Sequence, residues 1–244
     1  MKPVVFIMRR ELKSYFATPI AYVVLVFFLF MANLLTFWLG QFYERGQADL
    51  TPFFNFMPWL YLILIPAVSM RLWAEERRNG TIELLLTQPT TLWQAVVAKF
   101  LAAWVFVGIA LALTFPIWVT VNYLGNPDNG AIFAAYLGCF FFAGGFLAVG
   151  SFTSSITKNQ LIAFLIAVVI SFLLLIIGYP KSIDWLGLWL PQWVLDGIVS
   201  LSFYDHFENI TKGVLDLRDV LYYGLVAVFF LLASTVVLDA RKSK

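Results

Sequence analysis

Two residue types that carry much of protein chemistry are almost missing from this chain of 244 residues, which has one cysteine, Cys139, and one histidine, His206. A single cysteine excludes an intramolecular disulfide. One cysteine and one histidine are also too few for a zinc-type site or for Cys–His catalysis within one chain. We therefore predict no catalytic residue and no metal site, and we expect His206 to be a structural residue.

The phosphate-binding loop of common ATPases is also missing, because it needs a glycine followed by lysine and then serine or threonine. None of the eight lysines follows a glycine. The chain is therefore expected to bind no ATP by this route, to be no enzyme and to hold no cofactor. If it performs work, the energy comes from another subunit.

Charged residues are scarce, at 12% of the chain, against roughly 25% in soluble domains. Six apolar stretches are long enough to cross a bilayer, which takes about 20 residues as a helix. These are residues 20–42, 54–73, 95–121, 132–152, 161–179 and 221–238. The chain is predicted to be an all-α polytopic membrane protein whose residues 1–244 form one transmembrane domain.

Two of these stretches carry residues that affect helix packing. Pro58 and Pro66 lie in the second stretch and permit kinks. Gly144, Gly145 and nearby small residues lie in the fourth and let neighbouring helices approach closely. We expect these small residues to pack helices rather than to line a pathway.

Apart from Arg71, the third residue from the end of the second span, charge inside the predicted spans is limited to Lys99, near one end of the third span, where we expect it to extend toward the membrane surface. Ion-coupled carriers usually have ionisable residues at mid-membrane depth, and polar pores have charged rings or lined carbonyls. Both classes are therefore disfavoured.

The distribution of charge outside the spans predicts the orientation, because cytoplasmic loops are rich in lysine and arginine. With six spans both termini share one side. If that side is cytoplasmic, it holds twelve of the 16 bases and five of the 14 acids, and the other side holds four bases and nine acids. We therefore expect a multi-pass membrane protein with both termini in the cytoplasm.

Residues 4–17 have the pattern of a helix that lies on a membrane. Its apolar residues share one face at helical spacing, while Arg9, Arg10 and Lys13 fall on the other. A basic face toward anionic lipid headgroups is typical of interfacial helices. The alternative is an ordinary basic flank of the first span. Thr18 and Pro19 are then expected to restart the chain as helix cap and first helical residue.

The densest charge cluster occupies a short connection between two spans, residues 74–89, "AEERRNGTIELLLTQP". The second span is expected to continue through Arg78 and to end at the left-handed break of Asn79 and Gly80. A short helix capped by Thr81 is expected to follow, and Pro89 discourages its continuation. Thr91 and Gln94 predict a capping box that starts the third span. The polar residues expected to dock another protein are Glu75, Glu76, Arg77, Arg78, Asn79, Gly80, Thr81 and Glu83.

A solvated anchor for topology is the alternative reading of this cluster. Such an anchor requires bases, whereas this connection also carries three acids and an apolar "ELLL" patch. Charges of both signs beside an apolar patch suit a protein partner better.

Residues 180–220 are rich in tryptophan but are interrupted by charges and by Pro191. Each charge near the bilayer centre costs about 2.5–3.5 kcal/mol, so this segment is not expected to form another pair of spans. We expect short helices at the outer interface instead.

Three stretches together resemble a known family: "RRELKSYFATPIAY", "MRLWAEERRNGTIELLLTQPTTLWQAVVAKFLAAW" and "HFENITKGVLDLRDVLYY". They resemble the ABC-2 type permeases of ABC transporters, and most of all the gliding-motility-associated permeases. The resemblance implies that residues 74–89 are the coupling element that docks a separate P-loop ATPase, which holds ATP and Mg²⁺. It also implies that the N-terminal helix lies beside this element and that two permease cores pair, as a homodimer or a heterodimer.

Three functions stay open at this point. The chain is expected to be the membrane subunit of an exporter, contacting membrane lipids but no nucleic acid. Alternatively, it transmits ATPase-driven motion to an extracytoplasmic accessory protein without transporting anything. An intramembrane enzyme is the weakest reading, because no catalytic cluster is visible. The apolar spans favour a lipid-linked, amphipathic or apolar cargo.

Overall fold

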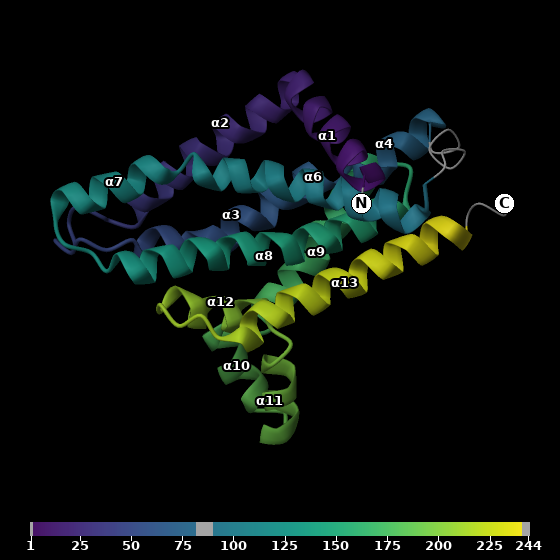
Figure 1. Cartoon of the computed structure of the whole chain (residues 1–244). Helices are drawn as coiled ribbons and strands as arrows, with labels where there is room; N and C mark the ends of the chain where they lie inside the picture. Colours follow the sequence, from purple (N-terminus) through teal and green to yellow (C-terminus); the bar gives the residue numbers. More distant parts are fainter. Residues whose placement is uncertain (1, 82–89, 241–244) are drawn as a thin grey trace.

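The computed structural model of the chain describes residues 2–81 and 90–240, and every regular element in that part is helical (Figure 1). The all-α prediction is thus confirmed. The helices are α1 (Lys2–Ala17), α2 (Pro19–Leu34), the π-helical turn η1 (Leu35–Leu39), α3 (Thr51–Ser69), α4 (Arg71–Asn79), α6 (Leu92–Ala112), α7 (Phe115–Leu124), α8 (Asn129–Ile156), α9 (Gln160–Ile176), α10 (Pro180–Gly187), α11 (Gln192–Val199), α12 (Phe203–Thr211) and α13 (Leu217–Ala240).

Five helical segments in the described part are long and apolar enough to cross a membrane. They are Pro19–Leu39, Thr51–Asn79, Leu92–Leu124, Asn129–Ile156 and Leu217–Ala240. A sixth is obtained if α9 and α10 count as one span, although the two helices meet at an angle of 71°. The predicted fifth span therefore ends earlier than expected, at Ile176, and the chain then turns sharply.

Short helix breaks lie within the second predicted span and at the start of the first. The second span continues through Arg78 as predicted, within the candidate span Thr51–Asn79, although α3 ends at Ser69 and α4 begins at Arg71. Pro66, one turn before the break, has no N–H to donate to the helix. At the start of the first span, Pro19 occupies the first helical turn as predicted, but the Thr18 hydroxyl donates back to Tyr15 O at 2.9 Å and caps nothing.

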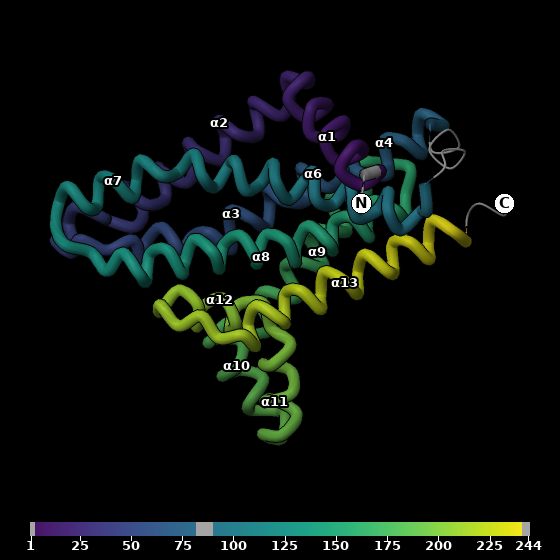
Figure 2. Tube along the Cα trace, in the orientation of Figure 1, coloured from purple at the N-terminus to yellow at the C-terminus, as the bar shows by residue number. Residues whose placement is uncertain are grey.

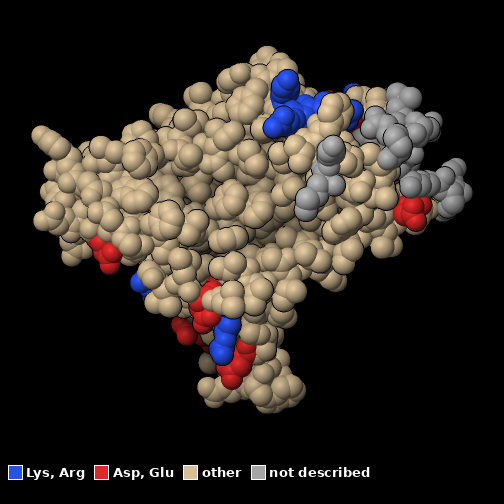
Figure 3. All heavy atoms as spheres, in the orientation of Figure 1, with Lys and Arg blue, Asp and Glu red and all other residues tan. Residues whose placement is uncertain are grey.

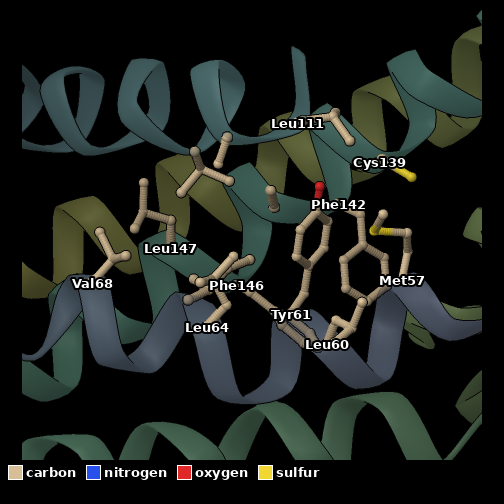
Figure 4. Packing of buried hydrophobic residues seen from close by; sticks show 14 of the residues in the cluster. Met57, Leu60, Tyr61, Leu64, Val68, Leu111, Cys139, Phe142, Phe146 and Leu147 are labelled. Carbon is tan, nitrogen blue, oxygen red and sulfur yellow. The ribbon is translucent and has the colours of Figure 1, made fainter. Parts of the chain in front are cut away.

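The core of the bundle surrounds α8, which packs against α3, α6, α9 and α13. Figure 4 shows Tyr61 and Leu64 of α3 facing Phe142 and Phe146 of α8. The glycines of α8 allow this packing, as predicted. A Cβ atom on Gly144 would lie 3.0 Å from the ring of Trp104.

The two termini lie at the same end of the bundle, which also carries α1 and α4 (Figure 1). We call it the charged end. The tube in Figure 2 shows α10 and α11 leaving the bundle as a hairpin, while α12 returns along α8.

The prediction of short helices within residues 180–220 is confirmed. α10, α11 and α12 have eight, eight and nine residues, so none is long enough to cross a membrane. Trp185, Trp189 and Trp193 of the hairpin are exposed. His206 of α12 is a structural residue here, since its ring nitrogens lie 2.6 Å from Asp219 Oδ1 and 3.1 Å from Ser200 O.

Candidate functional site

α4 is the helix on which the predicted docking residues lie, and its end has the predicted geometry. Gly80 has φ +70°, the left-handed conformation that glycine adopts without strain, and it caps α4. Thr81 N donates to Glu76 O at 3.0 Å and closes the last turn. The capping box of Thr91 and Gln94 at the start of α6 is also confirmed. Glu83, the proposed short helix after Thr81 and Pro89 lie outside the described residues.

The start of α4 is held by serines of α8. Ser154 Oγ accepts the backbone N–H groups of Trp73 at 3.0 Å and Ala74 at 3.1 Å, and it donates to Met70 O at 2.9 Å. A hydroxyl can make these three bonds at once. The indole N–H of Trp73 also donates to Ser151 Oγ at 3.2 Å. One side chain from another helix therefore bridges the break between α3 and α4, where backbone groups would otherwise lack partners.

The predicted docking residues of α4 divide into two groups. Arg77 Nη1 donates to Ser155 O at 2.6 Å, and Glu76 is also partly buried against the bundle. In contrast, the outward surface consists of Glu75, Arg78, Asn79, Gly80 and Thr81, all of which are exposed. We call these five residues the α4 outer face. Only this group is free to contact a partner without loosening α4 from the bundle.

Lys99 of α6 is the main electrostatic feature of the charged end. Its ammonium lies 2.7 Å from Glu76 Oε1 of α4 and 3.0 Å from Glu11 Oε2 of α1, and 5.5 Å from the centre of the Trp73 ring. The lysine side chain is only 3% exposed, while the two glutamate side chains are 18% and 19% exposed. We call Lys99, Glu11 and Glu76 the Lys99 latch.

The expectation that Lys99 extends to the membrane surface was therefore wrong. The two carboxylates come to the buried ammonium instead, because a buried charge is tolerated when it is paired and hydrogen bonded. The latch joins α4 and α6 to α1, and Glu11 and Lys99 are 88 residues apart in the sequence. A polar cavity of about 250 Å³, lined by latch residues with Arg71 and Glu75 among others, opens beside it.

α1 forms over the predicted range but uses its apolar face differently from the prediction. Tyr15 stacks on Phe106 of α6 with ring centroids 5.1 Å apart, and Phe16 lies 5.7 Å from the same ring. Burial raises the pKa of Tyr15 well above its ordinary value, so its hydroxyl stays neutral. Part of the face that we expected to meet lipid is thus a contact between helices.

The basic face of α1 is exposed, as predicted. Arg9, Arg10 and Lys13 all face outward, and Figure 3 shows basic side chains gathered over this part of the surface. Val5 and Phe6 are exposed as well, at 43% and 71%. The first turns of α1 therefore combine exposed apolar and basic side chains, the pattern of a helix in contact with a membrane surface.

Glu11 and the serines of α8 were missed as site residues by sequence reasoning. The charge of Lys99 inside the third predicted span was the available signal, because such a charge requires a partner. Among the described residues, no group of three His, Cys, Asp or Glu side chains is placed to hold a metal ion.

Comparisons with known proteins identify the family. The family profile described as "ABC-2 family transporter protein" matches residues 40–238 of the chain. Heme exporter protein B of Paracoccus denitrificans is 32% identical over 114 residues, which are 46% of this chain and 50% of that protein. Heme exporter protein B of Rhodobacter capsulatus is 30% identical over 104 residues, 42% of this chain and 46% of that protein.

The aligned region thus spans about half the length of these curated relatives. These matches do not support the finer resemblance to gliding-motility permeases. The family match covers most of the chain, and subunits of this family carry no ATPase activity of their own. This multi-pass membrane chain belongs to the ABC-2 family of transporter proteins, as the permease subunit of an ABC transporter.

Proposed function

We propose that the chain is one half of an ATP-driven exporter and that the ATPase subunit docks on the α4 outer face. The observation that carries this proposal is the division of α4 into two sides. Glu76, Arg77 and the backbone of Trp73 fix one side to α1, α6 and α8, while the other side is exposed. A helix that is firmly held and yet presents charges of both signs outward suits the receipt of force from a partner.

The charged end is the cytoplasmic end in this proposal. The excess of lysine and arginine expected on that side supports the assignment, and so does the position of both termini beside α4 (Figure 1). Residues 1–244 then form one transmembrane domain, which pairs with a second permease core. The basic face of α1 lies against the headgroups of the inner leaflet.

The cargo proposed here is an amphipathic or largely apolar molecule, and heme is one candidate because both relatives are named heme exporters. His206 does not serve as an iron ligand in this proposal. Both of its ring nitrogens are engaged, one with Asp219 and the other with Ser200 O. Recognition of such a cargo would rest on apolar contacts. A link to gliding motility stays a prediction from the sequence.

The test of docking is a charge reversal on the α4 outer face. Glu75→Lys with Arg78→Glu should strongly reduce co-purification of the P-loop ATPase with the tagged chain, while membrane insertion is unchanged. The matched control reverses an exposed pair of α12, Glu208→Lys with Lys212→Glu, whose side chains are 2.8 Å apart. ATPase recovered at the wild-type level with the α4 variant, over a range of salt, would contradict the proposal.

A further inference from the structure

A groove on the side of the bundle, between α6, α8 and α13, belongs to no part of the site described above. Its volume is about 400 Å³. Phe100 and Trp104 of α6 and Phe141 and Gly144 of α8 form one wall, and residues 220–228 of α13 form the other. All three helices belong to candidate spans, so the groove lies at membrane depth.

The lining offers no unsatisfied hydrogen-bonding side chain. Trp104 and Tyr223 are the two lining residues with polar side-chain atoms, and both atoms are taken. The Trp104 indole N–H donates to Phe140 O at 2.8 Å, and the Tyr223 hydroxyl donates to Phe203 O at 2.8 Å. The lining therefore suits an apolar chain, because a polar group placed there would lose its hydrogen-bonding partners.

One face of α13 carries a charge just before the residues that line the groove. Leu221, Leu225 and Val228 line the groove at helical spacing, and Arg218 precedes them on the same face. Arg218 is exposed, and within residues 2–81 and 90–240 its guanidinium makes no ion pair. The neighbouring Asp219 is engaged by His206.

The dimensions match one leaflet of a bilayer. Ten residues separate Arg218 from Val228, which is about 15 Å along a helix and half of a hydrocarbon core of about 30 Å. Arg218 is the second residue of the candidate span Leu217–Ala240, so it lies at the end of that span, where lipid headgroups are expected. Arginine is well suited to bind phosphate through paired hydrogen bonds.

We infer that this groove is a binding site for a phospholipid of the leaflet at the α12 end, with an acyl chain between α6 and α13 and its phosphate on Arg218. The site is separate from the docking surface on α4, so the inference does not depend on the proposed function.

Gly224 allows a selective test. Gly224 lines the groove, and a Cβ atom added there would meet nothing within 4 Å, so Gly224→Leu adds a side chain at the groove without a clash at its Cβ. Gly197→Leu in α11 is the matched control, since its Cβ also meets open space. The delipidated chain is mixed with phosphatidylglycerol, and native mass spectrometry measures the fraction of the chain that retains the lipid. Gly224→Leu should weaken binding roughly tenfold, the loss expected from about two methylene groups left unburied.

Arg218→Gln should weaken retention of phosphatidylglycerol but not of diacylglycerol, which has no phosphate. The inference would be overturned if Gly224→Leu retained phosphatidylglycerol as well as the wild type does. It would also be overturned if Gly197→Leu lost as much lipid binding as Gly224→Leu. Conversion of a dimer to a monomer by Gly224→Leu, with lipid retention unchanged, would assign the groove to a second copy of the chain instead.

A second measurement does not use the Gly224 variant. Phospholipid brominated on its acyl chain should quench part of the wild-type tryptophan fluorescence, and Trp104→Phe should remove that part. Quenching that is identical with and without Trp104 would contradict an acyl chain in the groove.

Discussion

Replacing Lys99 by methionine is expected to destabilise the chain strongly, because the change keeps the volume of the side chain and removes its charge. Glu11 and Glu76 would then face each other in a mostly buried site with no cation between them. Removal of one partner from a buried ion pair costs about 3–5 kcal/mol. For a protein of this size, the midpoint of thermal unfolding should fall by roughly 6–20 °C.

Cys139 provides the assay for this variant. It is the single cysteine of the chain and is completely buried in α8, so a fluorogenic thiol reagent reacts with it only as the bundle opens. Lys158→Met is the matched control. Lys158 is exposed, and a surface change of this kind usually alters stability by no more than about 0.5 kcal/mol.

A triple variant separates electrostatics from packing. When Lys99, Glu11 and Glu76 are all replaced by methionine, no unpaired charge is left, and such replacements of buried ion pairs are often neutral. Most of the lost stability should therefore return. The reasoning would be refuted if Lys99→Met alone unfolded at the wild-type midpoint temperature. It would also be refuted if the triple variant were no more stable than Lys99→Met.

Three further predictions concern the ends of the bundle. Ser154→Ala leaves the N–H groups of Trp73 and Ala74 without their acceptor, and it should lower the free energy of unfolding by about 1–3 kcal/mol, as measured by Cys139 reactivity. The control Ser155→Ala should lower it less, because the Ser155 hydroxyl bonds only within its own helix. Gly80→Val should lower cargo-stimulated ATPase activity of the reconstituted complex at unchanged expression, since a β-branched residue is strained at φ +70°; unchanged stimulation would argue against a role for this break. A cysteine at the exposed Ser200, in a Cys139→Ser background, should react with a membrane-impermeant reagent from the periplasmic side; labelling from the cytoplasmic side alone would invert the proposed topology.

Local signals in the sequence predicted the local structure of this chain well. The break at Gly80 and the capping box at Thr91 are properties of a few adjacent residues, and both are found where expected. The short helices of residues 180–220 followed from charges that are costly inside a bilayer, and they too are present. The lengths of the apolar stretches predicted the spans, but they did not predict the bend between α9 and α10.

Contacts between distant segments could not be predicted in the same way. The partner of Lys99 on α1 is 88 residues away, and the serine that caps α4 lies about 80 residues further along the chain. The face of α1 shows a second limit. An apolar side chain fits a lipid tail and a neighbouring helix equally well, so its sequence pattern did not reveal that Tyr15 packs on α6.

Cross-linking from α4 tests the central claim most directly. In a Cys139→Ser background, Asn79→Cys on the α4 outer face should form a cross-link to the P-loop ATPase that co-purifies with the chain, and Ser200→Cys at the opposite end should form none. A cross-link from Ser200→Cys, or none from Asn79→Cys in a complex that still contains the ATPase, would contradict docking on α4.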